Sequence, residues 1–110
     1  MRRGEIHLVP FEYSDLRGSK RRPACIVSSD QYNARGRDVI LAMITSNMTA
    51  REVGDIPVQD WRSAGLLKAS VVRSGRLRVL EQRLLTDARG SLSQGDLDAI
   101  DDALKAVFGL

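Results

Sequence analysis

The chain has 110 residues, 43% of them hydrophobic and 28% charged, which is the size and composition of one domain with a small core. No stretch approaches the ~18 apolar residues of a membrane span, and charges interrupt the first apolar run, which argues against a signal peptide. Cys25 is the only cysteine, so no internal disulfide can form. We therefore expect a single domain over residues 1–110, without a membrane partner, in the reducing cytoplasm.

The charge is uneven along the chain. Residues 1–89 carry 16 basic and 10 acidic side chains, whereas residues 90–110 carry one lysine and four aspartates. A basic body with an acidic end indicates a polyanionic partner, although ordinary surface variation explains the same counts equally well.

Short strands dominate the predicted elements. Runs of alternating or continuous apolar residues predict strands over residues 5–13, 24–27, 38–45, 53–58, 69–73, 77–80 and 85–88. Pro10 is expected at an edge or bulge of the first strand, and Ser74 with Gly75 at a tight turn or bulge. The continuous apolar run 38–45 predicts the central strand.

Polar segments connect these strands. Residues 14–22 and 46–52 are expected to be loops because they are polar and poor in strand-forming residues. Residues 28–37 predict a loop or one helical turn. Residues 60–65 predict a short helical turn, with Asp60 as its N-cap and Gly65 at its end.

One amphipathic helix ends the chain. Ser93 and Asp96 resemble a capping box, and apolar residues follow at spacings of three and four. These are Leu97, Ile100, Leu104, Val107 and Phe108. The sum of the elements predicts a mainly β, α+β fold, with a barrel-like antiparallel sheet and a C-terminal amphipathic helix.

Most catalytic motifs are missing. With one histidine and one cysteine, neither a His pair nor a zinc site is expected, and no glycine-rich phosphate loop is present, so we expect no metal or cofactor. Arginine remains, and its planar fork of donors matches phosphate oxygens. Two basic groups occur, namely Arg17, Lys20, Arg21 and Arg22, and Arg73, Arg76, Arg78 and Arg83. A solvated basic face is the plain alternative for any one of them.

Six short segments occur in a defined order along the chain. They are Arg3-Gly4-Glu5-Ile6, Gly18-Ser19-Lys20-Arg21-Arg22-Pro23, Ile26-Val27-Ser28, Ile44-Thr45-Ser46, Gly65-Leu66 and Ser70-Val71-Val72-Arg73. In this order and spacing they resemble the MazF/PemK family of toxins from bacterial type II toxin–antitoxin pairs. The resemblance covers nearly the whole chain.

The resemblance implies an SH3-like, CcdB-like antiparallel β-barrel with a C-terminal helix, assembled as a homodimer. It implies a metal-independent, sequence-specific endoribonuclease that cuts single-stranded RNA, mainly messenger RNA. The expected products carry a 2′,3′-cyclic phosphate and a 5′-hydroxyl. A cognate antitoxin is expected to bind in the groove that accepts RNA, because an acidic disordered tail fits such a groove.

The resemblance also assigns residues. The family's catalytic arginine before proline falls on Arg22, and its threonine or serine after the central strand falls on Thr45. A further arginine that some members use falls on Arg73, and further RNA contacts are expected at Arg17, Ser19, Lys20, Arg21, Ser46 and Asn47. Some members carry an aspartate where this chain has Gly75, and a histidine where it has Ser19. A mechanism that uses those two groups is therefore in doubt.

Two other functions fit the same charge and fold. One is a non-catalytic nucleic-acid-binding module, and the other is a CcdB-type toxin directed at gyrase. The combination of Arg22-Pro23 with Thr45 favours the nuclease. The general base stays open between a glutamate and water, because arginine, with a pKa above ~12, is a poor base.

Overall fold

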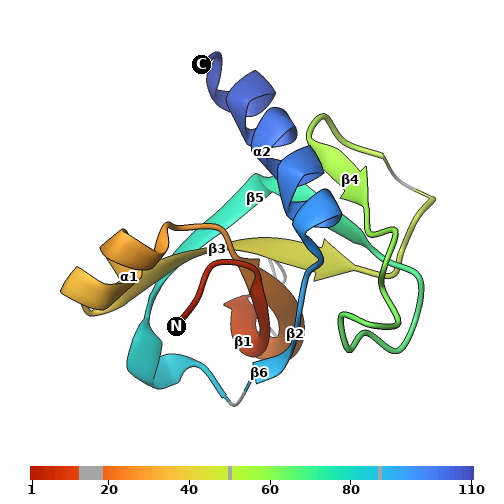
Figure 1. Cartoon of the computed structure of the whole chain (residues 1–110). Coiled ribbons are helices and arrows are strands. Elements are labelled where there is room, and N and C mark those ends of the chain that lie inside the picture. Colours follow the sequence, from red (N-terminus) through yellow and green to blue (C-terminus); the bar gives the residue numbers. More distant parts are fainter. Residues whose placement is uncertain (13–18, 50, 87) are drawn as a thin grey trace.

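The computed structural model describes residues 1–12, 19–49, 51–86 and 88–110. Figure 1 shows strands that curl around one another, with helix α2 lying across one side of them. The strands are β1 Glu5–Glu12, β2 Ser19–Ile26, β3 Asp38–Thr45, β4 Asp55–Pro57, β5 Val71–Glu81 and β6 Ala88–Ser91. The helices are α1 Asp30–Arg35, the 3₁₀ turn η1 Gln82–Leu84, and α2 Gln94–Phe108.

The strands form one antiparallel sheet in the order β4-β5-β3-β2-β1-β6. The prediction of a mainly β fold with a C-terminal helix is therefore confirmed. Among the described residues β4 and β6 end this order and do not pair with each other, so the sheet curls without closing into a ring. The central strand β3 has the bounds that its apolar run predicts.

The sheet is buried on both sides at its centre, in two hydrophobic clusters. One cluster lies between the sheet and α2 and includes Ile6, Ala42, Ile44 and Ile100. The other lies on the opposite side of the same strands, and Leu41 belongs to it. Because β3 contributes alternate residues to both clusters, its sequence is a continuous apolar run.

Cys25 belongs to the cluster beneath α2 and is fully buried. Burial raises the pKa of its thiol to about 12, so the thiol is uncharged at neutral pH. The thiol is therefore a small apolar part of the core.

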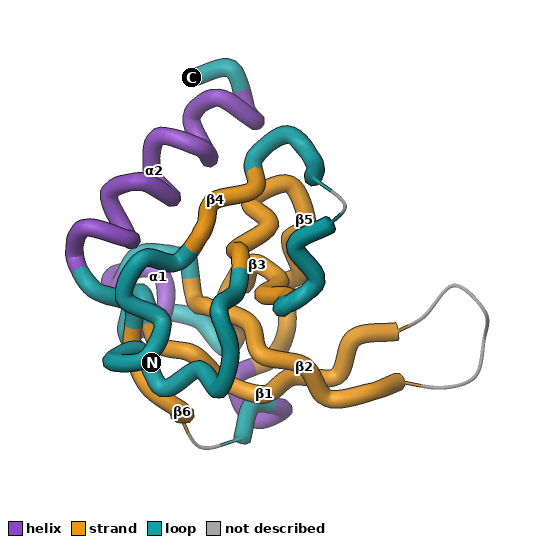
Figure 2. Tube along the Cα trace, turned by 90° about the vertical axis from the view of Figure 1, so that its right-hand side faces the viewer, coloured by secondary structure: helices purple, strands orange, loops and turns teal. Residues whose placement is uncertain are grey.

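The β1–β2 hairpin is longer than the sequence predicts. Residues 19–22, expected to be loop, belong to β2 and pair with β1 up to the register Glu12 with Ser19. Figure 2 shows this hairpin projecting from the body of the molecule. Residues 19–22 read Ser-Lys-Arg-Arg, so no apolar alternation marks this part of β2 in the sequence. Pro10 lies at an edge, as expected, since β6 pairs only with residues 5–7 of β1.

β5 and β6 also differ from the predicted elements. β5 is one strand with a bulge at residues 74–76, because Ala42 pairs with Leu77 whereas the adjacent Met43 pairs with Arg73. This confirms the bulge alternative for Ser74 and Gly75. The last strand spans 88–91 instead of 85–88. A glycine at its centre, Gly90, conceals it from a propensity argument.

Helix α2 begins as half of a capping box. The Ser93 hydroxyl accepts a hydrogen bond from the backbone N–H of Asp96, as expected. The Asp96 carboxylate does not complete the box, because it accepts hydrogen bonds from the backbone N–H groups of Gln59 and Asp60. The predicted apolar face is buried at Leu97 and Ile100, but Phe108 is 59% exposed, so the end of that face is not covered by this chain. Among the described residues, no helix is long and apolar enough to cross a membrane.

Candidate functional site

Arg22 and Thr45 meet where β2 and β3 separate. The last paired residues of these strands are Ala24 and Met43. Continuing the same antiparallel register by two residues places Arg22 opposite Thr45. Both residues line one pocket of about 370 Å³ at this end of the sheet.

The pocket combines an apolar base with several cations. Its lining consists of Ile6, Leu8, Arg22, Pro23, Ile44, Thr45, Ser46, Gly65, Leu66, Leu67, Lys68, Ser70 and Arg89. Three separate segments thus contribute a cation each, from β2, from the loop before β5 and from β6. Such an arrangement suits an anionic ligand that also has an apolar or aromatic part, such as a nucleotide.

The wall formed by residues 65–68 is fixed by a close backbone contact. A Cβ on Gly90 would lie 2.0 Å from the Ala64 carbonyl oxygen, and a Cβ on Gly65 would lie 2.3 Å from the Arg89 carbonyl oxygen. Gly65 also has φ +88°, a left-handed conformation that favours glycine. Glycine at both positions lets this loop pack directly on β6, which brings Lys68 and Arg89 to the same pocket.

The chain before this wall is held by Asp96. Its carboxylate is buried and accepts hydrogen bonds from the backbone N–H groups of Gln59 and Asp60, both at 3.0 Å. Residues 60–65 form the expected helical turn, because the backbone N–H of Ala64 donates to the Asp60 carbonyl at 3.0 Å and Gly65 follows with a positive φ. The backbone N–H of Asp60 itself donates to Asp96.

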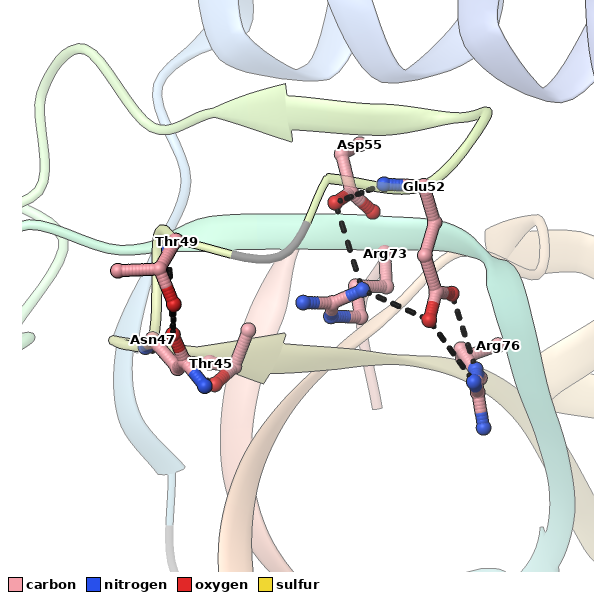
Figure 3. Close-up of polar contacts among 7 residues, drawn as sticks. All are labelled: Thr45, Asn47, Thr49, Glu52, Asp55, Arg73 and Arg76. Carbon is pink, nitrogen blue, oxygen red and sulfur yellow. Dashed lines mark hydrogen bonds and ion pairs between the residues drawn. The ribbon is translucent and has the colours of Figure 1, made fainter.

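Thr45 and the residues after it form a hydrogen-bonded turn, shown in Figure 3. The Thr45 hydroxyl oxygen accepts from the backbone N–H of Asn47 at 3.1 Å. The Asn47 carbonyl oxygen Oδ1 in turn accepts from the N–H and the hydroxyl of Thr49, at 3.1 and 2.7 Å. Because Thr45 Oγ1 accepts from Asn47, its own O–H proton is oriented away from that bond and is able to donate to a ligand.

Three of the expected site residues share the pocket: Arg22, Thr45 and Ser46. Asn47 belongs to the turn that supports Thr45, and Arg21 is exposed and donates to the Leu8 carbonyl at 3.4 Å. Ser19 and Lys20 lie in the outer part of β2, and Arg17 lies outside the described residues.

Arg73 is not brought to the pocket. It is buried in the middle of β5, and its Nη1 forms ion pairs with Glu52 at 3.0 Å and with Asp55 at 3.4 Å. Glu52 also accepts two hydrogen bonds from Arg76, at 3.1 and 2.8 Å. The hydrogen bond from Arg76 and the charges of both arginines lower the pKa of Glu52 below its usual 4.5.

Two pocket residues carry no sequence signal of their own. Lys68 and Arg89 stand outside both basic groups, and only the contact between residues 64–65 and 89–90 brings them together. The nearest sequence signal is Gly65-Leu66, which adjoins Lys68 but does not single it out.

Comparison with known proteins identifies the class. Residues 2–108 match the family model of the PemK-like, MazF-like toxins of type II toxin–antitoxin systems. The chain belongs to this toxin family. Among individual relatives, it is 27% identical over 113 residues to the endoribonuclease MazF of Staphylococcus epidermidis, covering all of this chain and 92% of that protein.

Solved structures have the same fold. An endoribonuclease from a mycobacterial species, in complex with its cognate antitoxin, superposes with a TM-score of 0.83 at 21% identity and covers 100% of this chain and 96% of its own. The Mycobacterium tuberculosis toxin MazF-mt6 gives 0.77 at 25% identity, covering 96% and 97%. MazF from Deinococcus radiodurans gives 0.78 at 19% identity, covering 100% and 97%.

Proposed function

We propose that this toxin is a sequence-specific endoribonuclease that cuts single-stranded RNA, mainly messenger RNA, in the cytoplasm. The observation that carries the proposal is the convergence of Arg22 and Thr45, where β2 and β3 separate, on one pocket lined by further cations. The family membership supports it, and so does the name of the staphylococcal relative, which is an endoribonuclease.

The reaction requires attack by the ribose 2′-hydroxyl on the adjacent phosphorus. A bond forms between O2′ and phosphorus, the bond from phosphorus to O5′ breaks, and the products are a 2′,3′-cyclic phosphate and a 5′-hydroxyl. Arg22 neutralises the charge on the phosphorane oxygens, and Thr45 donates a hydrogen bond to a phosphate oxygen and orients the scissile bond.

The protons move between the ribose oxygens and their surroundings. The 2′-hydroxyl loses its proton to water, since no carboxylate or imidazole is among the described residues that line the pocket. O5′ takes a proton from the Arg22 guanidinium or from water. Positioning and electrostatic stabilisation supply most of the acceleration in this scheme.

Lys68 and Arg89 bind the phosphates that flank the scissile one, and Ser46 contacts RNA beside Thr45. The outer part of β2, with Ser19, Lys20 and Arg21, attracts and guides the RNA strand. Arg17, which lies outside the described residues, is assigned the same role. The apolar base of the pocket, at Leu8, Pro23 and Leu66, packs against a base or ribose.

A cognate antitoxin and a second copy of the chain are the proposed protein partners. An acidic antitoxin segment fits the same cationic pocket and competes with RNA; the mycobacterial neighbour was solved with its antitoxin. Val53 and Phe108 are exposed apolar side chains beside the close approach of Gly54 to Val107, and a homodimer would cover them.

The test is incubation of purified protein with a long RNA in EDTA, with Arg22→Ala as the matched variant. Discrete fragments from the wild type alone support the proposal. Intact RNA in a retarded band would indicate a binding module. RNA that is neither cut nor bound, together with inhibition of gyrase, would indicate the gyrase-directed alternative.

A further inference from the structure

We propose that Arg73 is a positioning residue, which holds the connection between β3 and β4 so that Thr45 and Ser46 keep their places at the RNA site. The inference rests on the proposed function for its consequence in catalysis. Its structural part, that an ion-pair network orders this connection, stands on the contacts alone. The network consists of Arg73, Arg76, Glu52 and Asp55.

The topology places Arg73 beneath this connection. β5 lies between β3 and β4, so the chain leaves β3 at Thr45, crosses β5 and returns as β4 at Asp55. Arg73 pairs in register with Met43 on one side and with Asp55 on the other. Val71 and Val72 also pair with both strands, so Arg73 is the charged member of the three residues of β5 that lie between them.

The far end of the connection is bound directly to Arg73. Its Nη1 contacts carboxylates of Glu52 and Asp55, and the Asp55 carboxylate also accepts from the backbone N–H of Glu52 at 2.9 Å. The Gly54 carbonyl accepts from the backbone N–H of Ser74 at 3.0 Å. The side-chain contacts that Figure 3 shows, together with this backbone bond, thus join residues 52–55 to β5.

The bulge in β5 supplies the second arginine. Residues 74–76 fall outside the β3 register, which turns Arg76 toward the connection. Arg76 holds Glu52 with two parallel hydrogen bonds, a geometry that fixes orientation as well as distance. Glu52 is therefore held by two arginines, one buried and one 61% exposed.

The connection begins at the proposed RNA site, where β3 ends at Thr45. Hydrogen bonds join Asn47 to Thr45 and to Thr49. Ser46, between Thr45 and Asn47 in the chain, lines the pocket. A connection fixed at both ends keeps this turn in one conformation. Release of the Glu52 end is expected to loosen the turn at Thr45.

Glu52→Gln is the variant that tests this inference. Replacing Arg73 would leave the Asp55 carboxylate, whose side chain is 2% exposed, buried without its cation, and the protein would then fail to fold. Glu52 is more exposed, and glutamine keeps its shape while removing its charge. The matched control is Glu81→Gln, which breaks a pair of equal length with Arg83, 2.8 Å, at the other end of β5.

The first readout is amide hydrogen exchange at Asn47 and Thr49. We expect Glu52→Gln to speed exchange at both amides by roughly threefold to tenfold, the range set by losing surface ion pairs, and Glu81→Gln to leave them unchanged. Equal exchange rates in the wild type and Glu52→Gln would overturn the inference.

The second readout, RNA binding and single-turnover cleavage, distinguishes a positioning effect from the mere loss of a negative charge. Loss of an anion near RNA should by itself tighten RNA binding, so a pure charge effect lowers KM and spares the cleavage rate of bound RNA. The inference predicts a slower single-turnover rate although RNA binds at least as tightly. Faster exchange with an unchanged rate would overturn the link to catalysis. Wild-type protein that cuts no RNA would overturn the proposed function, and the exchange rates would then decide the structural part.

Discussion

Arg22, within β2, and Thr45, at the end of β3, lie two residues beyond the last pair that joins these two strands. Each is held by its own strand, Arg22 through pairing with Val9 of β1 and Thr45 through pairing with Val71 of β5. The place where β2 and β3 separate, with each strand supported by its other neighbour, is thus the site.

Arg22 carries the charge stabilisation in this mechanism. We expect Arg22→Ala to slow single-turnover cleavage by about 10²- to 10³-fold, the loss typical of removing one transition-state hydrogen-bond donor. Arg22→Lys keeps the charge but loses the planar fork, so it should recover only part of the rate. Arg35→Ala, an exposed arginine on α1, is the control and should cut normally. A wild-type rate in Arg22→Lys would rule out the bidentate role.

The hydroxyl of Thr45 is the group that we expect to contact phosphate. Thr45→Val keeps the shape and removes the hydroxyl, and we expect a roughly 10- to 100-fold slower cleavage, since a hydrogen bond to a charged group is worth about 1.5–3 kcal/mol. Thr45→Ser keeps the hydroxyl and should retain most of the activity. Equal rates for the valine and serine variants, in a quenched-flow assay, would exclude a role for this hydroxyl.

Lys68 and Arg89 should contribute to affinity through phosphate contacts. The measurement is the salt dependence of binding to a 2′-O-methyl oligonucleotide of the cleaved sequence, which cannot be cut by this route. Each phosphate contact adds about 0.7 to the slope of log K against log salt for a single strand, so Lys68→Ala with Arg89→Ala should reduce the slope by about 1.4. Lys105→Ala, a change to an exposed lysine on α2, is the control. An unchanged slope would place both cations outside the RNA path.

Gly90 is required where the 65–68 wall packs on β6. We expect Gly90→Ala to destabilise the fold by about 3 kcal/mol or more, because the new Cβ would meet the Ala64 carbonyl oxygen at 2.0 Å. Gly95→Ala is the matched control, since a Cβ there meets nothing within 4 Å, and in a helix it should stabilise by about 0.5–1 kcal/mol. Thermal unfolding of both variants is the measurement. Similar melting temperatures would contradict the described contact.

The ion pairs of Glu52 should be lost at low pH. Arg76 and Arg73 lower the folded-state pKa of Glu52 below the unfolded value of 4.5, so its pairs are complete above pH 4.5 and are lost as pH falls through the lowered value. We expect the protection factor of the Asn47 amide to fall in that range in the wild type. The Glu52→Gln variant should show no such step. A step of equal size in both proteins would assign it to another group.

The sequence was most informative where burial governs the pattern. Asp38–Thr45 was predicted with its observed bounds, because both faces of β3 are buried and its apolar run ends where the strand ends. Ser93 was predicted as the cap of α2, because a local hydrogen bond determines it. The outer half of β2 was predicted as loop, because residues 19–22 are all polar and carry no strand pattern.

The site was predictable only in part. Arg22 and Thr45 are named by the family resemblance, and the register of β2 with β3 explains why they converge. Lys68, Arg89 and the carboxylate of Asp96 reach their positions through contacts between distant segments. The role expected for Arg73 came from the family resemblance, whereas its burial beside Glu52 and Asp55 is a tertiary property.

The most direct test of the account is cleavage of an RNA that carries a single 2′-deoxynucleotide on the 5′ side of the mapped cut. Attack by the 2′-hydroxyl predicts that this substrate stays intact, while the unmodified RNA gives a 2′,3′-cyclic phosphate and a 5′-hydroxyl. Cleavage of both substrates at the same rate, or products with a 3′-hydroxyl and a 5′-phosphate, would contradict the mechanism assigned to Arg22 and Thr45.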